Sequence, residues 1–456
     1  MNQQLWNNIL AFDFDDPPGE YGFTTRLANE NYWTKSFTQQ AIMEYRRFMY
    51  MAATADLMVS PSPVVDIVWH QHLIFSQSYQ AFCDLIGKAV QHLPSTHNES
   101  DFEKFRIAKE RTKKLYRETF GEPPATVWDH KGMYESLHLE KAGFPIRGFV
   151  VAGILAFLIL LFPFYYLLRP VYIQIDNPDF MIGYIVCFFV VFAFLQVYNR
   201  KRLKKIIANA DPASFIYQLE PLELVYLKTQ KLSNVINGVV NELVADNRID
   251  INADYTISMS GKGTTNSIEE LQVMNTLNTL GTTYYPNLLK QLTRKPVFWN
   301  TANSMNAFRK YFYKSKKFAA VFYLNFIVLM LLLLAGTTRL ITGILRDKPI
   351  ILIAGLLVLT GVIIFIHLYR FTRLVCTHTI PELYRSQFVT PAQLQSNWQW
   401  HYFMSGSTAL TLSFIPIVNY TERKYDTGST GSSCGSSCGS SCGSSCSSCG
   451  GCGGGD

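Results

Sequence analysis

Four long stretches without a charged residue constrain this 456-residue chain more than any other feature. They cover residues 148–168, 180–198, 318–336 and 349–369. An α-helix needs about 20 apolar residues to cross about 30 Å of hydrocarbon, and each stretch has that length. A helix buried in a soluble core seldom stays uncharged for so long. The sequence therefore predicts four membrane-spanning helices and excludes a fully soluble or disordered chain.

Lysine and arginine residues are unevenly distributed around these stretches. Fourteen of them lie before the first and third stretches or after the second and fourth, all on one side of the predicted membrane: Lys141, Arg147, Arg200, Lys201, Arg202, Lys204, Lys205, Arg309, Lys310, Lys314, Lys316, Lys317, Arg370 and Arg373. The opposite ends carry only Arg169, Arg339, Arg346 and Lys348. Because the richer side normally faces the cytoplasm, both termini and residues 199–317 are expected there. This pattern predicts an integral protein of the cytoplasmic (inner) membrane, of bacterial type, with bilayer lipid as a partner.

The net charge of +7 has the same origin, because the basic excess lies beside the apolar stretches. It indicates topology rather than nucleic-acid binding, and no nucleic-acid partner is expected. Residues 1–20 lack the basic and apolar regions of a secretory signal. Most of the chain lies outside the four stretches, which disfavours a channel or transporter built mainly of membrane helices.

Residues 1–135 are expected to form a helical soluble domain, because residues 33–53 and 101–120 carry apolar side chains at helical spacing. The most informative stretch, residues 60–94, lies between them, and the Ser-Pro pairs at its beginning predict a helix start, because proline suits the first turn. Its candidate functional residues are Asp66, Trp69, His70, His72, Tyr79, Cys83 and His92.

Asp66 and His70 share a helix face, whereas His70 and His72 point about 200° apart, so the three cannot all be co-ligands on a straight helix. Asp66 can orient the His70 imidazole, and Cys83 and His92 would complete a zinc set of Asp, His, Cys and His. Two alternatives stay open: a structural role beside Trp69, and an enzyme or redox site of Asp66, His70, His72 and Cys83. The domain has no P-loop, nucleophile elbow or HExxH motif, which favours a binding protein over an enzyme.

The segment VVDIVWHQHLIFSQSYQAFC, with Gly87, His92, Pro94, Tyr116 and Phe120-Gly121 after it, resembles the glycine-rich-domain-containing proteins. The resemblance covers about 110 residues and rests on the pattern V-D-x-x-W-H-x-H. It implies a domain of unknown function rather than a particular activity.

Residues 206–300 are expected to form a small cytoplasmic α+β insert. Helices at 221–228 and 233–246 precede a strand at 255–259, which is the outline of a winged-helix module. The second helix has no lysine or arginine, so packing or protein interaction is favoured over DNA reading. The segment LEPLELVYLKTQKLSNVINGVVNELVADNRIDI resembles an uncharacterised bacterial membrane-protein family whose members end in tails rich in Gly, Ser and Cys. Lys228-Thr229-Gln230 departs from that family, in which glycines are common at these positions.

The C-terminal part is expected to form a juxtamembrane segment at residues 374–425 and a disordered low-complexity tail at 431–456. Six cysteines repeat in this tail: Cys434, Cys438, Cys442, Cys446, Cys449 and Cys452. Their spacing suits thiolate sites for Zn or Cu(I). Thiol exchange, covalent modification, and a repeat with no ligand role are the alternatives.

The sequence thus predicts a mainly α protein with a helical N-terminal domain, four membrane helices, a winged-helix-like insert and a disordered tail. The leading functional hypothesis is a membrane-anchored scaffold or binding protein that takes a metal or a protein partner through its His/Asp motif and cysteine tail. The alternatives are a membrane-bound enzyme or redox protein and a sensor that acts through the insert.

Overall fold

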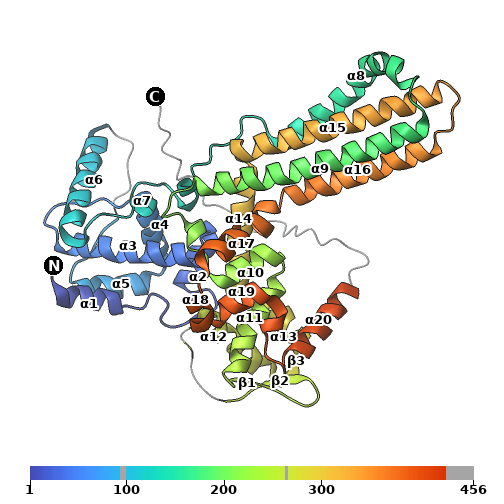
Figure 1. Ribbon diagram of the computed structural model, residues 1–456. Helices are drawn as coiled ribbons and strands as arrows, with labels where there is room; N and C mark the ends of the chain where they lie inside the picture. Colours follow the sequence, from blue (N-terminus) through green and yellow to red (C-terminus); the bar gives the residue numbers. More distant parts are fainter. Residues whose placement is uncertain (93–98, 262–264, 266, 428–456) are drawn as a thin grey trace.

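The computed structural model describes residues 1–92, 99–261, 265 and 267–427, and this part of the chain is mainly helical, as predicted. A bundle of four long helices projects from a body built of shorter helices and one small sheet (Figure 1). The cysteine-rich tail, with all six of its cysteines, lies outside the described residues.

Four helices are long and apolar enough to cross a membrane, as the uncharged stretches predict. They are α8 (Ile146–Tyr172), α9 (Asn177–Ala208), α15 (Lys316–Ile344) and α16 (Ile351–Phe371). The other helices lie at one end of this bundle, and the short connections α8–α9 and α15–α16 lie at the far end (Figure 1). The N-terminal body, the insert and residues 372–427 are therefore on the same side of any membrane that the bundle crosses.

Helix α15 is the central member of the bundle. Half of its most apolar window is buried, against none of that of α8, so α8 is left to face lipid. Polar side chains join α15 to its neighbours: the Asn199 and Asn325 amides exchange hydrogen bonds of 2.8 and 2.7 Å, and His367 Nε2 lies 3.3 Å from Asn325 Oδ1. Polar groups at such depth need internal partners, and these contacts tie α9, α15 and α16 together.

Arg339 closes the far end of the bundle. Its guanidinium donates to the backbone carbonyls of Tyr172 and Ile175 and, over 2.8 Å, to Asn177 Oδ1. The last carbonyls of a helix have no partner within it, so the arginine satisfies the end of α8 and the connection that follows. A residue that the sequence indicates as a topology signal thus also serves as a cap.

The N-terminal body is built of short helices around a buried carboxylate. Its elements are α1 (Gln3–Ala11), α2 (Phe23–Asn31), α3 (Lys35–Thr54), α4 (Pro63–Ile74), α5 (Ser76–Ile86), α6 (Glu99–Phe120), α7 (Ala125–Trp128) and η1 (Met133–Leu137). Glu44 of α3 is 2% exposed and accepts hydrogen bonds of 2.8 Å from the Tyr116 hydroxyl, the Trp128 indole and Arg47. A buried charge requires such partners, and these bonds join α3, α6 and α7.

The insert follows the predicted order of helix, helix and strand. Its elements are η2 (Phe215–Tyr217), α10 (Pro221–Thr229), α11 (Leu232–Ala245), β1 (Ile249–Ile251), β2 (Thr256–Met259), α12 (Ile268–Leu280), β3 (Thr283–Tyr284), α13 (Tyr285–Leu292) and α14 (Pro296–Tyr313). The strands form an antiparallel sheet in the order β1-β2-β3, with Ile251 opposite Ile257. The assignment of this unit as a winged helix stays a prediction.

Residues 374–427 pack against the insert instead of lying apart from it. They form η3 (Val375–Thr379), α17 (Ile380–Leu383), η4 (Tyr384–Phe388), α18 (Pro391–Ser396), α19 (Trp398–Ser405), η5 (Gly406–Ala409) and α20 (Ile415–Thr427). The Tyr402 hydroxyl donates to the Asn234 carbonyl over 2.9 Å, and the Thr411 amide donates to Asn241 Oδ1 over 2.8 Å. The aromatic side chains of Tyr402 and Phe403 are buried in this contact.

The N-terminal body and the insert share one hydrophobic core, and a cluster of charges lies at their seam. Lys35 Nζ lies 2.8 Å from Glu269 Oε1 and 3.5 Å from Glu220 Oε2, and the Lys35 amide donates to Glu223 over 3.1 Å. Burial raises the pKa of Glu223 to about 7. Burial also acts to raise the pKa of Glu269, but attraction to Lys35 outweighs it and the pKa is lowered. The seam is therefore held by one cation among three carboxyl groups.

Replacing Lys35 with methionine tests this seam. The K35M variant should lose about 1 kcal/mol of unfolding free energy at pH 7, a modest value because the Lys35 side chain is 43% exposed. The lowered pKa of Glu269 means that the pair stabilises the fold above its ordinary pKa of 4.5 and does so less as the pH falls. The deficit should therefore shrink at pH 4. Urea unfolding followed by tryptophan fluorescence measures it, and a deficit unchanged with pH would contradict the role of the pair.

Candidate metal centre

Helix α4 carries the predicted Trp-His-x-His motif and begins where the sequence indicates. The Ser62 hydroxyl accepts a hydrogen bond from the Val65 amide, and Pro63 occupies the first turn, where its missing N–H costs nothing. This start places Asp66 in the first turn and His70 one turn later on the same face.

Asp66 is the centre of a three-residue group that includes His92 from the loop after α5. His92 Nε2 lies 2.9 Å from Asp66 Oδ1, and His70 Nε2 lies 3.5 Å from Asp66 Oδ2. The two imidazole rings are 4.3 Å apart between centroids. One ligand atom from each residue lies within 4.8 Å of the others, so the group can hold a metal ion.

These separations suit a tetrahedral zinc ion. Bonds of about 2.0–2.2 Å to nitrogen and oxygen place neighbouring ligand atoms roughly 3.4 Å apart. The two distances from the histidine nitrogens to the Asp66 carboxylate, 2.9 and 3.5 Å, are close to that spacing. The His70 side chain is 55% exposed, which leaves one side of the group open to a fourth ligand.

A chain of hydrogen bonds holds the loop that carries His92. The Trp69 indole N–H donates to the Tyr79 hydroxyl over 3.1 Å, and this hydroxyl donates to the Val90 carbonyl. Burial raises the pKa of Tyr79 to about 12, so the hydroxyl keeps its proton at neutral pH. Trp69 also contacts the His92 ring edge-on, at 4.6 Å between centroids. Trp69 and Tyr79, which are not candidate ligands, thus position the candidate ligand His92.

Lys88 provides a second anchor for the same loop. Its ammonium group donates to the carbonyls of Ala52 and Ala55 over 2.8 and 3.0 Å, at the end of α3. Gly87 turns the chain at the end of α5 with a φ of 70°, a conformation that glycine adopts without strain. Sequence reasoning missed Lys88, because only its position one residue after the glycine suggests a loop anchor.

His72 lies on another side of α4, inside the hydrophobic core. Its Nδ1 is 2.8 Å from the Tyr45 hydroxyl and its Nε2 is 3.2 Å from Ser78 Oγ. The ring is fully buried among aromatic side chains, including those of Phe14 and Phe23. Burial lowers its pKa to about 4, so the ring is neutral at pH 7. His72 therefore has a structural place, separate from the Asp66 group.

Cys83 is also outside the group. It is 4% exposed, on the buried side of α5. The structure thus narrows the five expected ligands of this domain to Asp66, His70 and His92, and it does not bring Asp66, His70, His72 and Cys83 into one cluster. Metal binding itself stays a prediction.

Comparisons with protein-family models, with curated proteins and with solved structures found no match to this chain. The function must therefore be argued from the geometry of the chain's own residues.

Alanine at His70 or at His72 separates the two roles. We expect H70A to lower zinc affinity by about a hundredfold, since it removes a ligand, and to change the unfolding free energy by less than about 0.5 kcal/mol. H72A should cost about 2–4 kcal/mol, because it leaves a cavity and two unpaired hydroxyls.

Isothermal titration with zinc and urea unfolding measure the two effects on the same preparations. Equal zinc affinity in H70A and the unchanged protein would show that His70 is not a ligand. A stable H72A variant would contradict the structural role of His72.

Proposed function

We propose that this chain is a membrane-anchored binding protein that holds one zinc-class ion at Asp66, His70 and His92 on the cytoplasmic side. The observation that carries this proposal is the convergence of three ligand atoms, from α4 and from the loop after α5, within 4.8 Å. The cytoplasmic side is supported by the charge bias of the sequence, and the described soluble parts lie together at one end of the bundle.

The donor set favours zinc over the other ions considered. Two imidazoles and a carboxylate suit Zn²⁺, whereas Cu(I) prefers the thiolates of residues such as those in the tail. Ca²⁺ and Mg²⁺ prefer all-oxygen sites. The cysteine tail remains a separate proposed thiolate site, for Zn or Cu(I), outside the described residues.

The scaffold role rests on the shared core. The N-terminal body, the insert and residues 374–427 pack as one unit on the membrane bundle, so a partner bound to any of them is held at the membrane. The insert, as a winged-helix-like unit, is the proposed protein-interaction part.

A metal-dependent enzyme is the second candidate, and one observation favours it. Catalytic zinc sites have three protein ligands and an open position, and the exposed side of His70 provides such an opening. An enzyme of this kind would activate a water at the open position for hydrolysis. Hydrolysis of a model ester that is lost in H70A and kept in H401A, which changes an exposed histidine outside the group, would support it.

Metal content of the purified protein tests the leading proposal. We expect about one zinc per chain to remain when the chain is truncated after Thr430, because the proposed ligands precede the tail. Elemental analysis of the full chain and the truncated chain, both with reduced thiols, provides the measurement. Zinc that disappears on truncation would assign the metal to the cysteine tail, and its absence from both would leave a scaffold without metal.

Tyr79 provides a test that does not remove a ligand. Y79F deletes the hydroxyl that links Trp69 to Val90, so His92 should be held less firmly and zinc affinity should fall by about tenfold. The matched control is Y134F, which removes a 3.2 Å hydroxyl-to-backbone hydrogen bond elsewhere in the same body. An equal affinity in the two variants would contradict the positioning role of Tyr79.

A further inference from the structure

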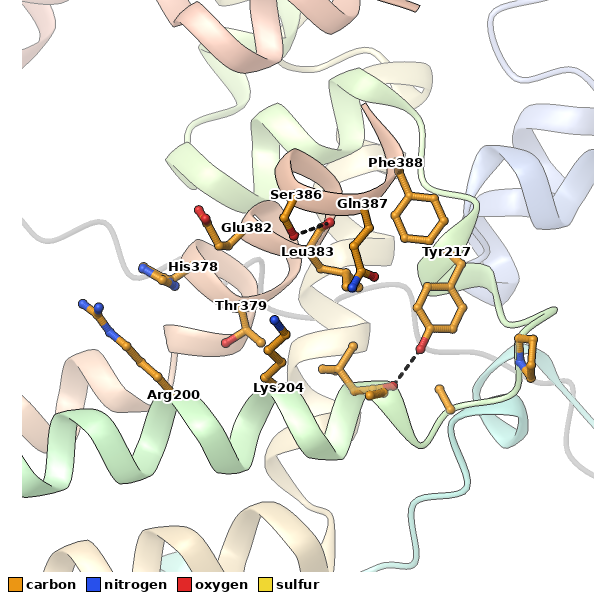
Figure 2. A pocket seen from close by; sticks show the side chains of 14 residues that line it. Arg200, Lys204, Tyr217, His378, Thr379, Glu382, Leu383, Ser386, Gln387 and Phe388 are labelled. Carbon is orange, nitrogen blue, oxygen red and sulfur yellow. Dashed lines mark hydrogen bonds between the residues drawn. The ribbon is translucent and has the colours of Figure 1, made fainter. Parts of the chain in front are cut away.

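A cavity of 710 Å³ lies where the membrane bundle meets the soluble body, far along the chain from Asp66. One wall is the last part of α9, with Arg200 and Lys204, and the other is formed by η3, α17 and η4. Figure 2 shows Arg200 and Lys204 projecting from α9 toward His378 and Thr379 on the opposite wall.

The walls are direct continuations of membrane helices, which fixes the depth of the cavity. Helix α9 has 32 residues and would be about 48 Å long, so its end extends beyond a hydrocarbon layer of about 30 Å. Arg200 comes two residues after Tyr198, the predicted end of the span. The opposite wall begins four residues after α16 ends at Phe371. The cavity therefore opens at the level of the lipid headgroups.

The cavity is positively charged on the side nearest the bundle. Among the residues that the structure describes, Arg200, Lys204 and His378 form no ion pair. The single carboxylate of the lining, Glu382, lies 4.0 Å from Arg385. Two cations one helical turn apart, with an imidazole opposite, are suited to an oxyanion such as a phosphodiester.

The part of the lining formed by η4 and η2 offers polar and aromatic contacts. Ser386 and Gln387 supply a hydroxyl and an amide, and the rings of Tyr217 and Phe388 stack at 5.8 Å between centroids (Figure 2). The Tyr217 hydroxyl donates to the Ile207 carbonyl over 2.9 Å, which fastens this side to α9. The lining thus has groups for the hydroxyls of a headgroup beyond its phosphate.

The backbone on this wall is unusual. Residues Val375–Thr379 and Tyr384–Phe388 are π-helical, and these two turns carry His378, Thr379, Ser386, Gln387 and Phe388 into the lining. π-Helical turns are rare and occur frequently at functional sites. This feature is independent of the charge pattern, and it marks the same cavity.

We propose that this cavity binds the headgroup of an anionic phospholipid, with the phosphate between Arg200, Lys204 and His378. The acyl chains remain in the bilayer beside α9 and α16, and the headgroup hydroxyls reach Ser386 and Gln387. The site is separate from the candidate metal centre and does not depend on metal binding.

The test titrates the full chain, in a neutral detergent, with short-chain phosphatidylglycerol and, separately, with short-chain phosphatidylcholine. The variant R200Q/K204Q should bind phosphatidylglycerol at least about tenfold more weakly than the unchanged chain, because it removes both charge-assisted contacts proposed for the phosphate. The matched control K201Q/K205Q removes two charges from the same part of α9, at positions outside this cavity. It should change the affinity by no more than about twofold.

Several results would overturn the proposal. Equal losses in the two double variants would show attraction to a general basic belt and no built site. Equal affinity for the two lipids would exclude recognition of the anionic headgroup. Displacement by inorganic phosphate at the same concentration as the lipid would assign the cavity to a soluble anion. Both double variants change exposed side chains. Should R200Q/K204Q not fold, the two single variants R200Q and Q387A repeat the test.

Discussion

A bilayer offers no water to satisfy polar groups, and this requirement arranges the whole molecule. Four helices close their backbone hydrogen bonds internally, and the polar groups that remain among them find partners, as Asn199 does with Asn325. Arg339 satisfies the end of α8 at the far side. The candidate metal centre and the basic cavity both belong to the other end of the bundle, where α9 and α16 continue into the soluble body (Figure 1).

The soluble body is one packed unit, although its parts are separated by membrane helices in the sequence. Lys35 joins the N-terminal body to the insert, and Tyr402 joins the last helices to it. The candidate metal centre and the basic cavity belong to different faces of this unit, one in the N-terminal body and one at the membrane junction. A shared core between a candidate metal centre and a proposed lipid-headgroup site is an arrangement suited to the proposed scaffold held close to the membrane.

The sequence predicted the elements better than their packing. Uncharged length indicated the membrane helices, and Ser62-Pro63 indicated the start of α4, because both depend on local physics. The angular spacing of Asp66, His70 and His72 also indicated that they could not all be co-ligands. Local patterns do not show which distant side chains meet. Cys83 was therefore grouped with the ligands although α5 buries it, and the packing of Trp398 and Tyr402 on the insert was not foreseen. The basic run at Arg200 was interpreted as topology alone, because His378 and the π-helical wall opposite it come from a distant segment.

The coordination of bound zinc tests the central claim most directly. X-ray absorption at the zinc edge, on the chain truncated after Thr430 and loaded with one equivalent of zinc, reports the ligand atoms and their distances. The account predicts nitrogen and oxygen ligands at about 2.0–2.1 Å with the scattering pattern of two imidazoles. A sulfur shell at about 2.3 Å would place the ion at a cysteine such as Cys83, and would contradict the assignment to Asp66, His70 and His92.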